Sequence, residues 1–404
     1  MSERQRSIAD VVKGPFDEGA LRERIEGARA LLAEERCDLA LVYVSADLMG
    51  QSGEIVEMVQ VHGRARLLAG CSGLGVLGNG EEVEEGPALA FALLRLPGAR
   101  LVGAHVTAGD VEAGLEPEGW RERLGTGVDE TGGWLAFGDP YSLDAESWLR
   151  QWNEAFPGVP MVGGLAGAGA GVTQTQLYLN QRVLTEGAVV VSVGGEVGIE
   201  AIVSQGCRPI GKPWTVTGAE QNLIHQIGNL PALTVLQETF DGLPARDKER
   251  ARGNIFVGLA VNEYQEEHRR GDFLVRNLLA ADPNSGVVAV GARVRIGQTL
   301  QFQFRDGGAA DEDLVELIEG VRRRLAGREV HAACLCSCAG RGAQLFGRPD
   351  HDAGAVHRGL GGEVPLAGFF GNGEIGPVGG RNFLHGYTAA AALFVSHGDR
   401  DIAS

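Results

Sequence analysis

Aromatic residues and positive charges are scarce in this sequence. Only 6% of its 404 residues are aromatic, and 36 Lys and Arg stand against 53 Asp and Glu, so the formal net charge is −17. No stripe of basic residues offsets this excess, and an acidic surface repels a phosphate backbone or an anionic membrane. We therefore expect neither a nucleic acid nor a membrane as a partner.

Long apolar runs and paired cysteines are also missing. No uninterrupted apolar stretch approaches the roughly 18–20 residues of a membrane-spanning helix. The segment Met1–Arg6 lacks the apolar core of a signal peptide. None of the six cysteines forms a C-x-x-C pair, and a chain of this size does not need disulfides to fold. We expect a cytoplasmic protein with reduced thiols.

Two segments resemble ligand-binding motifs only in part. Gly73–Gly78 matches G-x-G-x-x-G, but an acidic turn follows it where a dinucleotide fold requires a helix N-terminus. Cys334, Cys336 and Cys338 would share one face of a strand at a spacing of about 7 Å. That spacing is too wide for adjacent ligands of one zinc ion. We favour buried packing of these cysteines over a metal site.

Histidines and aspartates also gather near residue 350. Asp350, His351, Asp352 and His357 carry the atoms that a mononuclear metal site uses. The residue types alone make such a site conceivable. We favour the interpretation that they are surface residues of a loop and a helix, and we expect no bound metal.

Enough apolar residues are present for well-packed cores, since they make up 44% of the chain. The length suggests two or three domains. The 62 glycines are about twice the usual share. They indicate many tight turns and close approaches of the backbone.

Three segments of the chain share one order of elements. Each runs from an apolar strand through a helix or loop to a second strand, a glycine-rich turn and a further apolar strand. A chain rich in Gly and Ala can resemble itself by chance, but the shared order and similar spacing favour structural duplication. The paired segments are 39–45 and 66–75, 134–137 and 160–169, and 332–338 and 365–373, and the later strands are 88–94, 188–193 and 388–395.

Residue periodicity places further elements. It predicts a helix near residues 18–36 and strands over 188–206 and 287–305. The capping-box pattern Thr217–Glu220 predicts a helix that begins there. We expect an α/β (α+β) fold with mixed β-sheets flanked by helices, in two subdomains built from a repeated strand–helix–strand–hairpin unit.

The polar stretch 243–253 is the best candidate for a domain boundary, because it contains Pro, Gly and many charges. We place the boundary near residue 245. The expected organisation is an N-terminal helix and arm over 1–34, a first domain over 35–245 and a second domain over 246–404.

The C-terminal third carries a distinctive series of motifs. Cys336–Gly342 ends a strand, Val364–Pro377 follows, and Phe383–Thr388 precedes an apolar strand. The series closely resembles the C-terminal subdomain of the FIST domain family. The family's usual run is Ser-Cys-x-x-Arg-Gly, then Gly-Phe-x-x-x-Gly-Glu-Ile-Gly, then His-Asn-x-Thr. Gly386 stands here in place of the family's Asn.

The preceding part of the chain resembles the family's N-terminal subdomain. Ser72-Gly73 departs from the family, which often has Thr two residues after the Cys of the first turn. The resemblance covers roughly residues 35–395. The matching segments are Val42–Ser45, Gly70–Ser72, Gly163–Ala166, Thr217–Asn222 and Leu230–Ala232.

The resemblance implies an intracellular sensory protein for small ligands, with amino acids as the suggested class. Some family members are fused to signalling enzymes, and we expect residues 1–35 to be too short for such an output domain. The resemblance therefore implies a separate signalling protein or a homo-oligomer as the output. Another branch that resembles the family binds haem and senses nitric oxide. Haem is thus the one cofactor that the resemblance leaves open, and we otherwise expect none.

We expect the ligand site at the glycine-rich turns, above all in the third segment. The guanidinium of Arg341 and the carboxylate of Glu374 could hold the two ends of a zwitterion, while nearby glycines let backbone amides approach. The alternative is that Arg341 and Glu374 pair with each other or cap turns. The candidate ligand-binding residues are Arg341, Glu374, Asn372, Cys338, His385 and Gly373.

Two other functions remain open at this point. Cys338, beside Arg341 and with His351 or His385 near it, could be the activated thiolate of an enzyme. The sequence gives no base–nucleophile geometry, so we favour a protein without catalytic activity. A scaffold or interaction module would also fit the low aromatic content and the acidic surface.

Overall fold

The computed structural model describes residues 7–32, 36–169, 171–263, 265, 268 and 270–397. Within these ranges the chain forms two compact units. The first unit contains the chain up to Val203, Leu314–Leu384 and the chain from Thr388 onward. The second unit contains Ser204–Asp313 and His385–Tyr387. Both are mixtures of helices and strands, which confirms the expected fold class.

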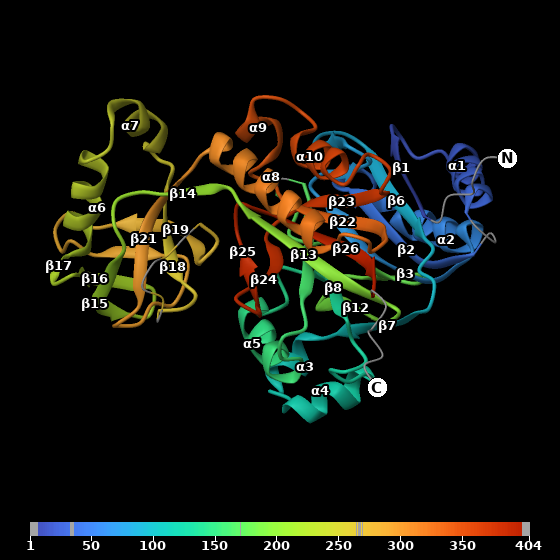
Figure 1. The fold of residues 1–404 in the computed structure, drawn as a ribbon, viewed down its shortest axis with the longest axis horizontal. Coiled ribbons are helices and arrows are strands. Elements are labelled where there is room, and N and C mark those ends of the chain that lie inside the picture. The colour runs from blue at the N-terminus through green and yellow to red at the C-terminus, as the bar shows by residue number, and fades with distance from the viewer. Residues whose placement is uncertain are drawn as a thin grey trace. The chain divides into compact units, whose positions relative to one another are not determined.

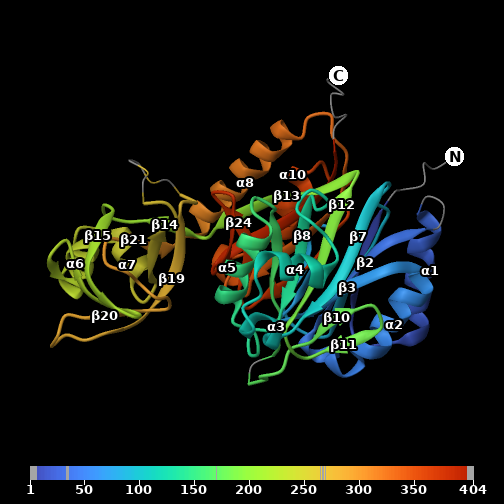
Figure 2. The same ribbon diagram turned by 90° about the horizontal axis from the view of Figure 1, so that it is seen from below.

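The first repeat begins with two parallel strands, β2 (Cys37–Ser45) and β3 (Ala65–Gly73). Between them lie η2 (Ala46–Gln51) and α2 (Ser52–Gly63). Figure 2 shows α1 (Glu18–Leu31) and α2 along one face of this sheet. The sheet order is β1-β6-β2-β3-β10-β11, where β1 is Ile8–Lys13 and β6 is Ala88–Leu94.

The amphipathic pattern of α1 explains its position. Asp17 accepts a hydrogen bond from the amide of Ala20 and caps the helix. Leu21, Ile25 and Ala28 form the buried stripe that faces the sheet. The predicted helix over 18–36 is confirmed as far as Leu31, and residues 33–35 lie outside the described residues.

The second repeat has the same order of elements. Its parallel strands are β8 (Gly133–Gly138) and β9 (Met161–Leu165), joined by α5 (Ala145–Ala155). Trp148 and Trp152 lie on the buried face of α5. The sheet order is β25-β24-β9-β8-β12-β7, with β7 at Ala99–Val106 and β12 at Ala188–Gly195, and two further helices are α3 (Ala108–Glu112) and α4 (Pro117–Leu124).

The third repeat packs in the same unit as the first two, although it follows them by more than 100 residues of chain. Its parallel strands are β22 (Val330–Cys338) and β23 (Leu366–Gly371). Figure 1 shows β22, β23 and β26 as neighbouring strands. The other elements are α9 (Gly342–Phe346), α10 (His351–Gly359), β26 (Thr388–Ser396) and β13 (Val197–Gln205), in the sheet order β13-β26-β22-β23-β4-β5.

Each repeat sends the hairpin that follows its second parallel strand into the sheet of another repeat. The exchange is cyclic, so every sheet contains a hairpin from a different repeat. The first repeat's β4 (Val76–Gly78) and β5 (Glu81–Val83) join β23, the second repeat's β10 (Leu177–Leu179) and β11 (Arg182–Leu184) join β3, and the third repeat's β24 (Glu374–Val378) and β25 (Arg381–His385) join β9. The predicted threefold duplication is confirmed.

One glycine recurs at the same position in all three repeats. Gly70, Gly163 and Gly368 lie in the second parallel strand of their repeats. A Cβ atom added there would lie 1.8–1.9 Å from a carbonyl oxygen of the neighbouring parallel strand. Only glycine permits this approach, and the common position aligns the repeats residue by residue.

The core shared by the three repeats contains one aromatic ring from each. The ring of Tyr43 lies 5.7 Å from that of Phe137 and 5.2 Å from that of Phe369, and Phe137 and Phe369 are 5.9 Å apart. Cys334 and Cys336 are buried in the same cluster, and the Sγ of Cys334 is 2.9 Å from the Oη of Tyr43. The predicted packing role of these two cysteines is confirmed.

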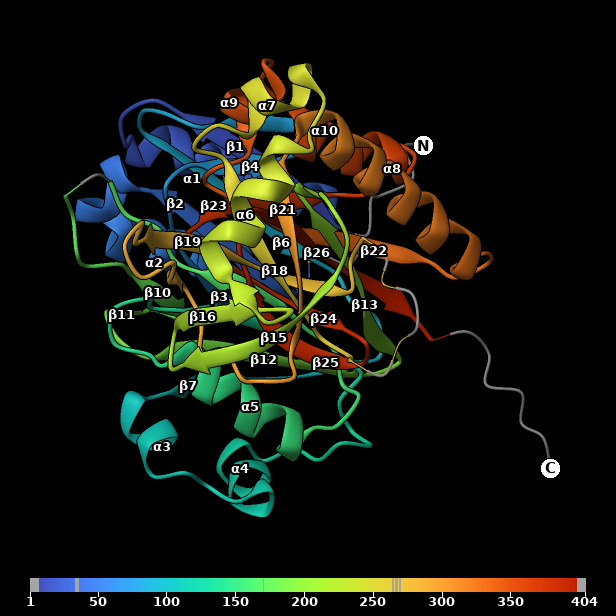
Figure 3. The same cartoon turned by 90° about the vertical axis from the view of Figure 1, so that its left-hand side faces the viewer.

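The second unit is an antiparallel barrel, closed because β18 (Ile255–Ala260) pairs with both β19 (Phe273–Ala281) and β21 (Thr299–Arg305). In Figure 3, α6 (Ala232–Asp241) and α7 (Ala245–Ala251) lie outside the strands. The remaining strands are β14 (Cys207–Pro209), β15 (Trp214–Glu220), β16 (Leu223–Ile227), β17 (Leu230–Pro231) and β20 (Val288–Val290), and α8 (Gly307–Arg324) continues into the first unit.

The helix predicted to begin at Thr217 is wrong. Thr217 lies in β15, and the apolar residues that suggested a helical stripe belong to β16, its antiparallel neighbour. Gln221 has a positive φ of 53° at the turn between the strands, so the chain reverses there. Half-buried strands joined by a short turn can imitate a capped helix in sequence.

The compact units divide the chain differently from the expected boundary. Residue 245 lies inside the second unit, at the first residue of α7. The part expected to form an arm before α1 includes β1, which pairs with β6. Among the described helices, none combines the length and the apolar character needed to cross a bilayer.

Candidate functional site

The glycine-rich turns in which the sequence predicts the site lie together in the first unit. Each turn donates a backbone hydrogen bond to the second parallel strand of another repeat, at N···O distances of 2.9–3.0 Å. In each contact, a second backbone hydrogen bond of 2.8–3.0 Å runs in the opposite direction, from an amide of the strand to a carbonyl of the segment that contains the turn. The three donor amides are those of Leu74, Gly167 and Asn372, and their acceptors are the carbonyls of Phe370, Ser72 and Leu165. We name this arrangement the three-turn junction.

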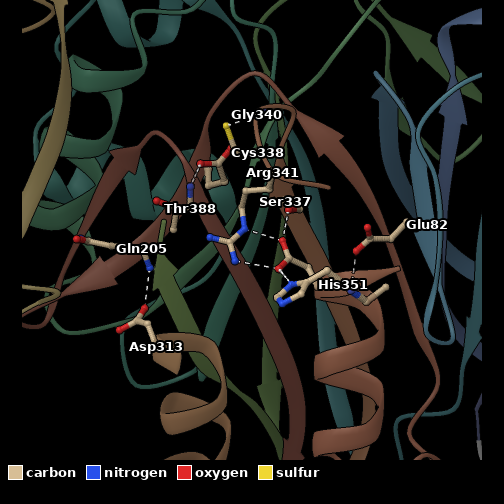
Figure 4. A network of polar contacts seen from close by, with 12 residues as sticks. Glu82, Gln205, Asp313, Ser337, Cys338, Gly340, Arg341, His351 and Thr388 are labelled. Atoms are coloured by element: carbon tan, nitrogen blue, oxygen red, sulfur yellow. Dashed lines mark hydrogen bonds and ion pairs between the residues drawn. The ribbon is translucent and has the colours of Figure 1, made fainter. Parts of the chain in front are cut away.

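Arg341, the first predicted site residue, is fully buried and paired with Asp352. Its Nε lies 2.6 Å from Oδ2 of Asp352 and its second terminal nitrogen lies 2.9 Å from Oδ1. Figure 4 shows this two-point contact at the start of α10. Burial opposes the charge of both groups, but their attraction raises the pKa of Arg341 and lowers that of Asp352.

Two more side chains satisfy the Asp352 carboxylate. The hydroxyl of Ser337 donates to Oδ2 at 2.7 Å, and Nδ1 of His351 lies 2.9 Å from Oδ1. The His351 ring stacks on Phe346. His351 and Asp352 are both buried, so the interpretation of these residues as surface groups is wrong. Arg341 and Asp352 lie 11 residues apart, Arg341 just before α9 and Asp352 in α10. No periodicity in the sequence predicts that they pair.

The acidic segment that follows β4 contributes to the same cluster. The carboxylate of Glu82 accepts from the amide of Ala353 at 2.9 Å, at the N-terminus of α10. The carboxylate of Glu84 accepts from the amide of Ala343 at 2.8 Å. Burial and the nearby charge of Asp352 raise the pKa of Glu82 to about 7. The sequence does not single out Glu82 and Glu84 as site residues, since only the exchanged hairpin brings them to the third repeat.

Glu374 is fully buried at the first residue of β24. Its Oε2 accepts a hydrogen bond from the amide of Thr388 at 3.0 Å. Its Oε1 is buried and has no hydrogen-bond partner among the described residues. Burial raises the pKa of Glu374 to about 8, although the Thr388 amide, the charge of Arg341 and a hydrogen bond with the Cys338 thiol offset part of this effect.

The other two repeats carry apolar residues at the position of Glu374. In the exchanged hairpins, Val76 pairs with Phe369 and Leu177 pairs with Cys71. Glu374 pairs with Gly164 in the same register, so Val76, Leu177 and Glu374 occupy equivalent positions. Val76 and Leu177 are buried in the central core. Gly164 permits the close approach of Cys336, since a Cβ on it would lie 2.3 Å from the Sγ of that residue.

The remaining predicted residues have different environments. Cys338 is half-buried, and Figure 4 shows it beside Thr388 and Arg341. Asn372 is exposed, and its side-chain amide donates to the carbonyl of Ala166 at 3.2 Å. The Gly373 carbonyl accepts from the Leu165 amide, which gives it a structural role in the three-turn junction. His385 is buried at the end of β25 and belongs to the second unit.

No group of three His, Cys, Asp or Glu residues is placed to hold a metal ion within the described ranges. Arg341 and Glu374 do not form the two-ended clamp that the sequence suggested, because Arg341 is engaged by Asp352. The cluster instead offers two buried carboxyl oxygens without a hydrogen-bond partner among the described residues, Oε1 of Glu374 and Oε2 of Glu82, next to a compensated ion pair.

The second unit contains a separate pocket of about 610 Å³, between α6, α7, β18 and β19. His, Cys, Met and Tyr, the side chains that commonly hold haem iron, are absent from its lining, so it does not fit haem. The lining residues are Leu236, Gln237, Phe240, Asp241, Ala251, Arg252, Gly253, Ile255 and Leu278.

Family models match almost the whole chain. The FIST N domain matches residues 38–229 and the FIST C domain matches residues 232–377. The chain belongs to the FIST family. FIST domains are associated with sensory functions and signal transduction.

Close relatives in mycobacteria have the same extent. An uncharacterized protein of Mycobacterium tuberculosis strain H37Rv is 38% identical over 377 residues, covering 93% of this chain and 96% of its own. An uncharacterized protein of Mycobacterium bovis is 36% identical over 380 residues, covering 91% and 93%. Among solved structures, a cyanuric acid hydrolase aligns over 97% of this chain and 100% of its own at 11% identity, but its TM-score of 0.32 supports no conclusion.

Proposed function

We propose that this protein is a cytoplasmic sensor of a small polar molecule, which acts at Glu374 in the three-turn junction. The single observation that carries the proposal is the buried Oε1 of Glu374, which lacks a hydrogen-bond partner among the described residues at a position that is apolar in the other two repeats. The sensory association of the FIST family supports the same function.

The energetic argument rests on the comparison between repeats. A buried polar group without a partner costs about 1–3 kcal/mol. The fold does not require a carboxyl here, because Val76 and Leu177 fill the corresponding positions. Groups that reduce stability and are not needed for the fold cluster at functional sites. Glu374 fits this pattern.

The chemistry of the cluster limits the ligand. Arg341 is paired with the carboxylate of Asp352, at 2.6 and 2.9 Å. The cluster therefore has no free positive charge to bind the carboxylate of a ligand. Oε1 of Glu374 can accept from an ammonium or an amide N–H group. Amino acids carry such a group, and we propose them as the ligand class.

A thermal-shift screen of the full chain against the amino acids tests the proposal. A ligand at 100 times its dissociation constant should add about 2.7 kcal/mol to the free energy of unfolding and raise the melting temperature. Glu374→Gln keeps the shape of the side chain but cannot ionise to pair with an ammonium group, so it should abolish most of this response. Glu82→Gln is the matched control, because Glu82 is a second buried carboxyl with a raised pKa.

We expect the Glu82→Gln protein to keep its ligand response. A response that survives in Glu374→Gln, or one that is lost equally in both variants, would contradict the assignment of Glu374. A screen in which no amino acid or related small acid shifts the melting temperature would contradict the ligand class.

We propose further that the signal passes to a separate signalling protein or through self-association. The two FIST models account for residues 38–377. Sedimentation velocity with and without the ligand distinguishes these outputs. A ligand-dependent change in mass supports self-association, while an unchanged monomer together with the absence of any ligand-dependent partner would oppose both.

A further inference from the structure

The floor of the pocket in the second unit is apolar. Leu236, Phe240, Ile255 and Leu278 are half-buried and pack against the core of the barrel. They also line the pocket. A ligand that covers them gains from the removal of their apolar surface from water.

Two opposite charges border this floor. Asp241 is the last residue of α6, and Arg252 directly follows α7. Both are exposed, both line the pocket, and neither forms an ion pair within the described part of the chain. The C-terminal end of α6 carries partial negative charge, which adds to the preference of Asp241 for a cationic group.

The state of Arg252 differs from that of other arginines in the same unit. Arg250 lies 3.0 Å from a carboxylate oxygen of Asp306, and Arg208 lies 2.8 Å from one of Asp247. The charges of these two arginines are therefore balanced by carboxylates. Arg252 and Asp241 keep their charges available at the edge of an apolar pocket.

The volume of the pocket indicates the size of the ligand. A water molecule occupies about 30 Å³ in the liquid, so 610 Å³ corresponds to a ligand of roughly twenty non-hydrogen atoms. That is about the size of two apolar amino acids, and it falls in the usual range of small-molecule sites.

We propose that this pocket binds a short apolar peptide with free termini, whose ammonium group lies at Asp241 and whose carboxylate lies at Arg252. The apolar side chains of the peptide cover the floor. All lining residues belong to the second unit. The proposal is therefore independent of any ligand at Glu374.

Calorimetric titration of the full chain with the dipeptide Leu-Phe tests the proposal. Arg252→Gln should weaken binding about tenfold or more, because it removes a charge-assisted hydrogen bond. Amidation of the peptide's carboxyl end should have the same effect, and the two changes together should cost little more than either alone. Asp241→Asn and acetylation of the peptide's amino end should each weaken binding in the same way, and the two together should cost little more than either alone.

Arg246→Gln is the matched control, because Arg246 is an exposed arginine of α7 that does not line the pocket. It should leave the affinity unchanged. Equal binding of the free and the blocked dipeptides would overturn the proposal, as would the absence of binding at millimolar concentration. Tighter binding of free leucine than of the dipeptide would overturn the proposed ligand size.

Discussion

The third repeat and the first two repeats share a backbone but differ in the side chains at its strand ends. All three have the parallel strand pair, the glycine at close approach and the backbone bonds of the three-turn junction. Only the third places a carboxyl, that of Glu374, where the others have Val76 and Leu177. The fold therefore tolerates apolar residues at this position in two repeats, and the carboxyl of Glu374 is the difference on which the proposed function rests.

The helix between the parallel strands of the second repeat packs through apolar side chains. Trp148 and Trp152 of α5 are fully buried, with ring centroids 5.5 Å apart. In the third repeat, Asp352 of α10 and Arg341 form a buried ion pair in the corresponding strand–helix connection. Apolar packing commonly serves stability as well as a buried ion pair or better, so stability alone does not account for the charged cluster.

The largest effects should come from the glycines that the repeats share. Alanine at Gly70, Gly163 or Gly368 would place Cβ 1.8–1.9 Å from a backbone carbonyl oxygen. We expect each variant to lose more than about 4 kcal/mol of stability or fail to fold, which far-UV circular dichroism and urea unfolding measure.

Gly27→Ala is the control for these variants. Gly27 lies inside α1, with no atom within 4 Å of an added Cβ, so alanine should raise the free energy of unfolding by up to about 1 kcal/mol. If the alanine variant of one of these three glycines had the same free energy of unfolding as the wild type, the three repeats would not be equivalent at this position.

Removal of one partner from the buried ion pair should have the next largest effect. Asp352→Ala leaves the Arg341 charge buried, and we expect a loss of about 3–5 kcal/mol in urea unfolding. Replacement of both residues by apolar ones should restore much of this loss. Arg324→Gln, which removes an exposed pair with Glu200, should change stability little. A small effect of Asp352→Ala would show that the pair is not buried in solution.

The pH dependence of stability should also separate the third repeat from the others. Glu374 and Glu82 have pKa values of about 8 and about 7, above the ordinary value of 4.5. The folded protein therefore holds these protons more tightly than the unfolded chain, so the free energy of unfolding should fall as the pH rises from 4.5 to 8.

Asp352 acts in the opposite direction. Its pKa lies below the ordinary 3.8, so its contribution is lost only as the pH falls below that value. Urea unfolding at a series of pH values measures both effects. The double variant Glu82→Gln, Glu374→Gln should flatten the decline above pH 4.5, and the exposed control Glu57→Gln should not. A decline that persists in the double variant would place its origin elsewhere.

The smallest effect should come from Asn372, which lies at the position of Leu74 in the first repeat. Asn372→Leu removes the hydrogen bond to the Ala166 carbonyl, and we expect a loss of no more than about 1 kcal/mol. Thermal unfolding measures it. A loss of several kcal/mol would mean that the side chain is essential to the three-turn junction.

Much of the fold could be predicted from the sequence. The strands of the repeats are apolar and bounded by glycine-rich turns, so their order and the duplication were visible. The cyclic exchange of hairpins was not, because strand pairing across repeats leaves no local pattern. The hairpin β15–β16 was mistaken for a helix because its apolar spacing fits both structures.

The site could be predicted only in part. Arg341 and Glu374 stood out because they lie in the motifs that resemble the FIST family, at glycine-rich strand ends. Their partners could not be predicted, since Asp352 and Glu82 reach the cluster through α10 and the exchanged hairpin. The unpartnered Oε1 of Glu374 became visible only when the three repeats were aligned in space.

The variant Glu374→Val tests the central claim most directly, because it gives the third repeat the residue of the first. We predict that the free energy of unfolding rises by about 1–3 kcal/mol, while the amino-acid response in thermal unfolding disappears. The reciprocal variant Val76→Glu should lose stability. A Glu374→Val protein that is less stable than the wild type, or that still responds to the ligand, would show that Glu374 serves the fold and not a ligand.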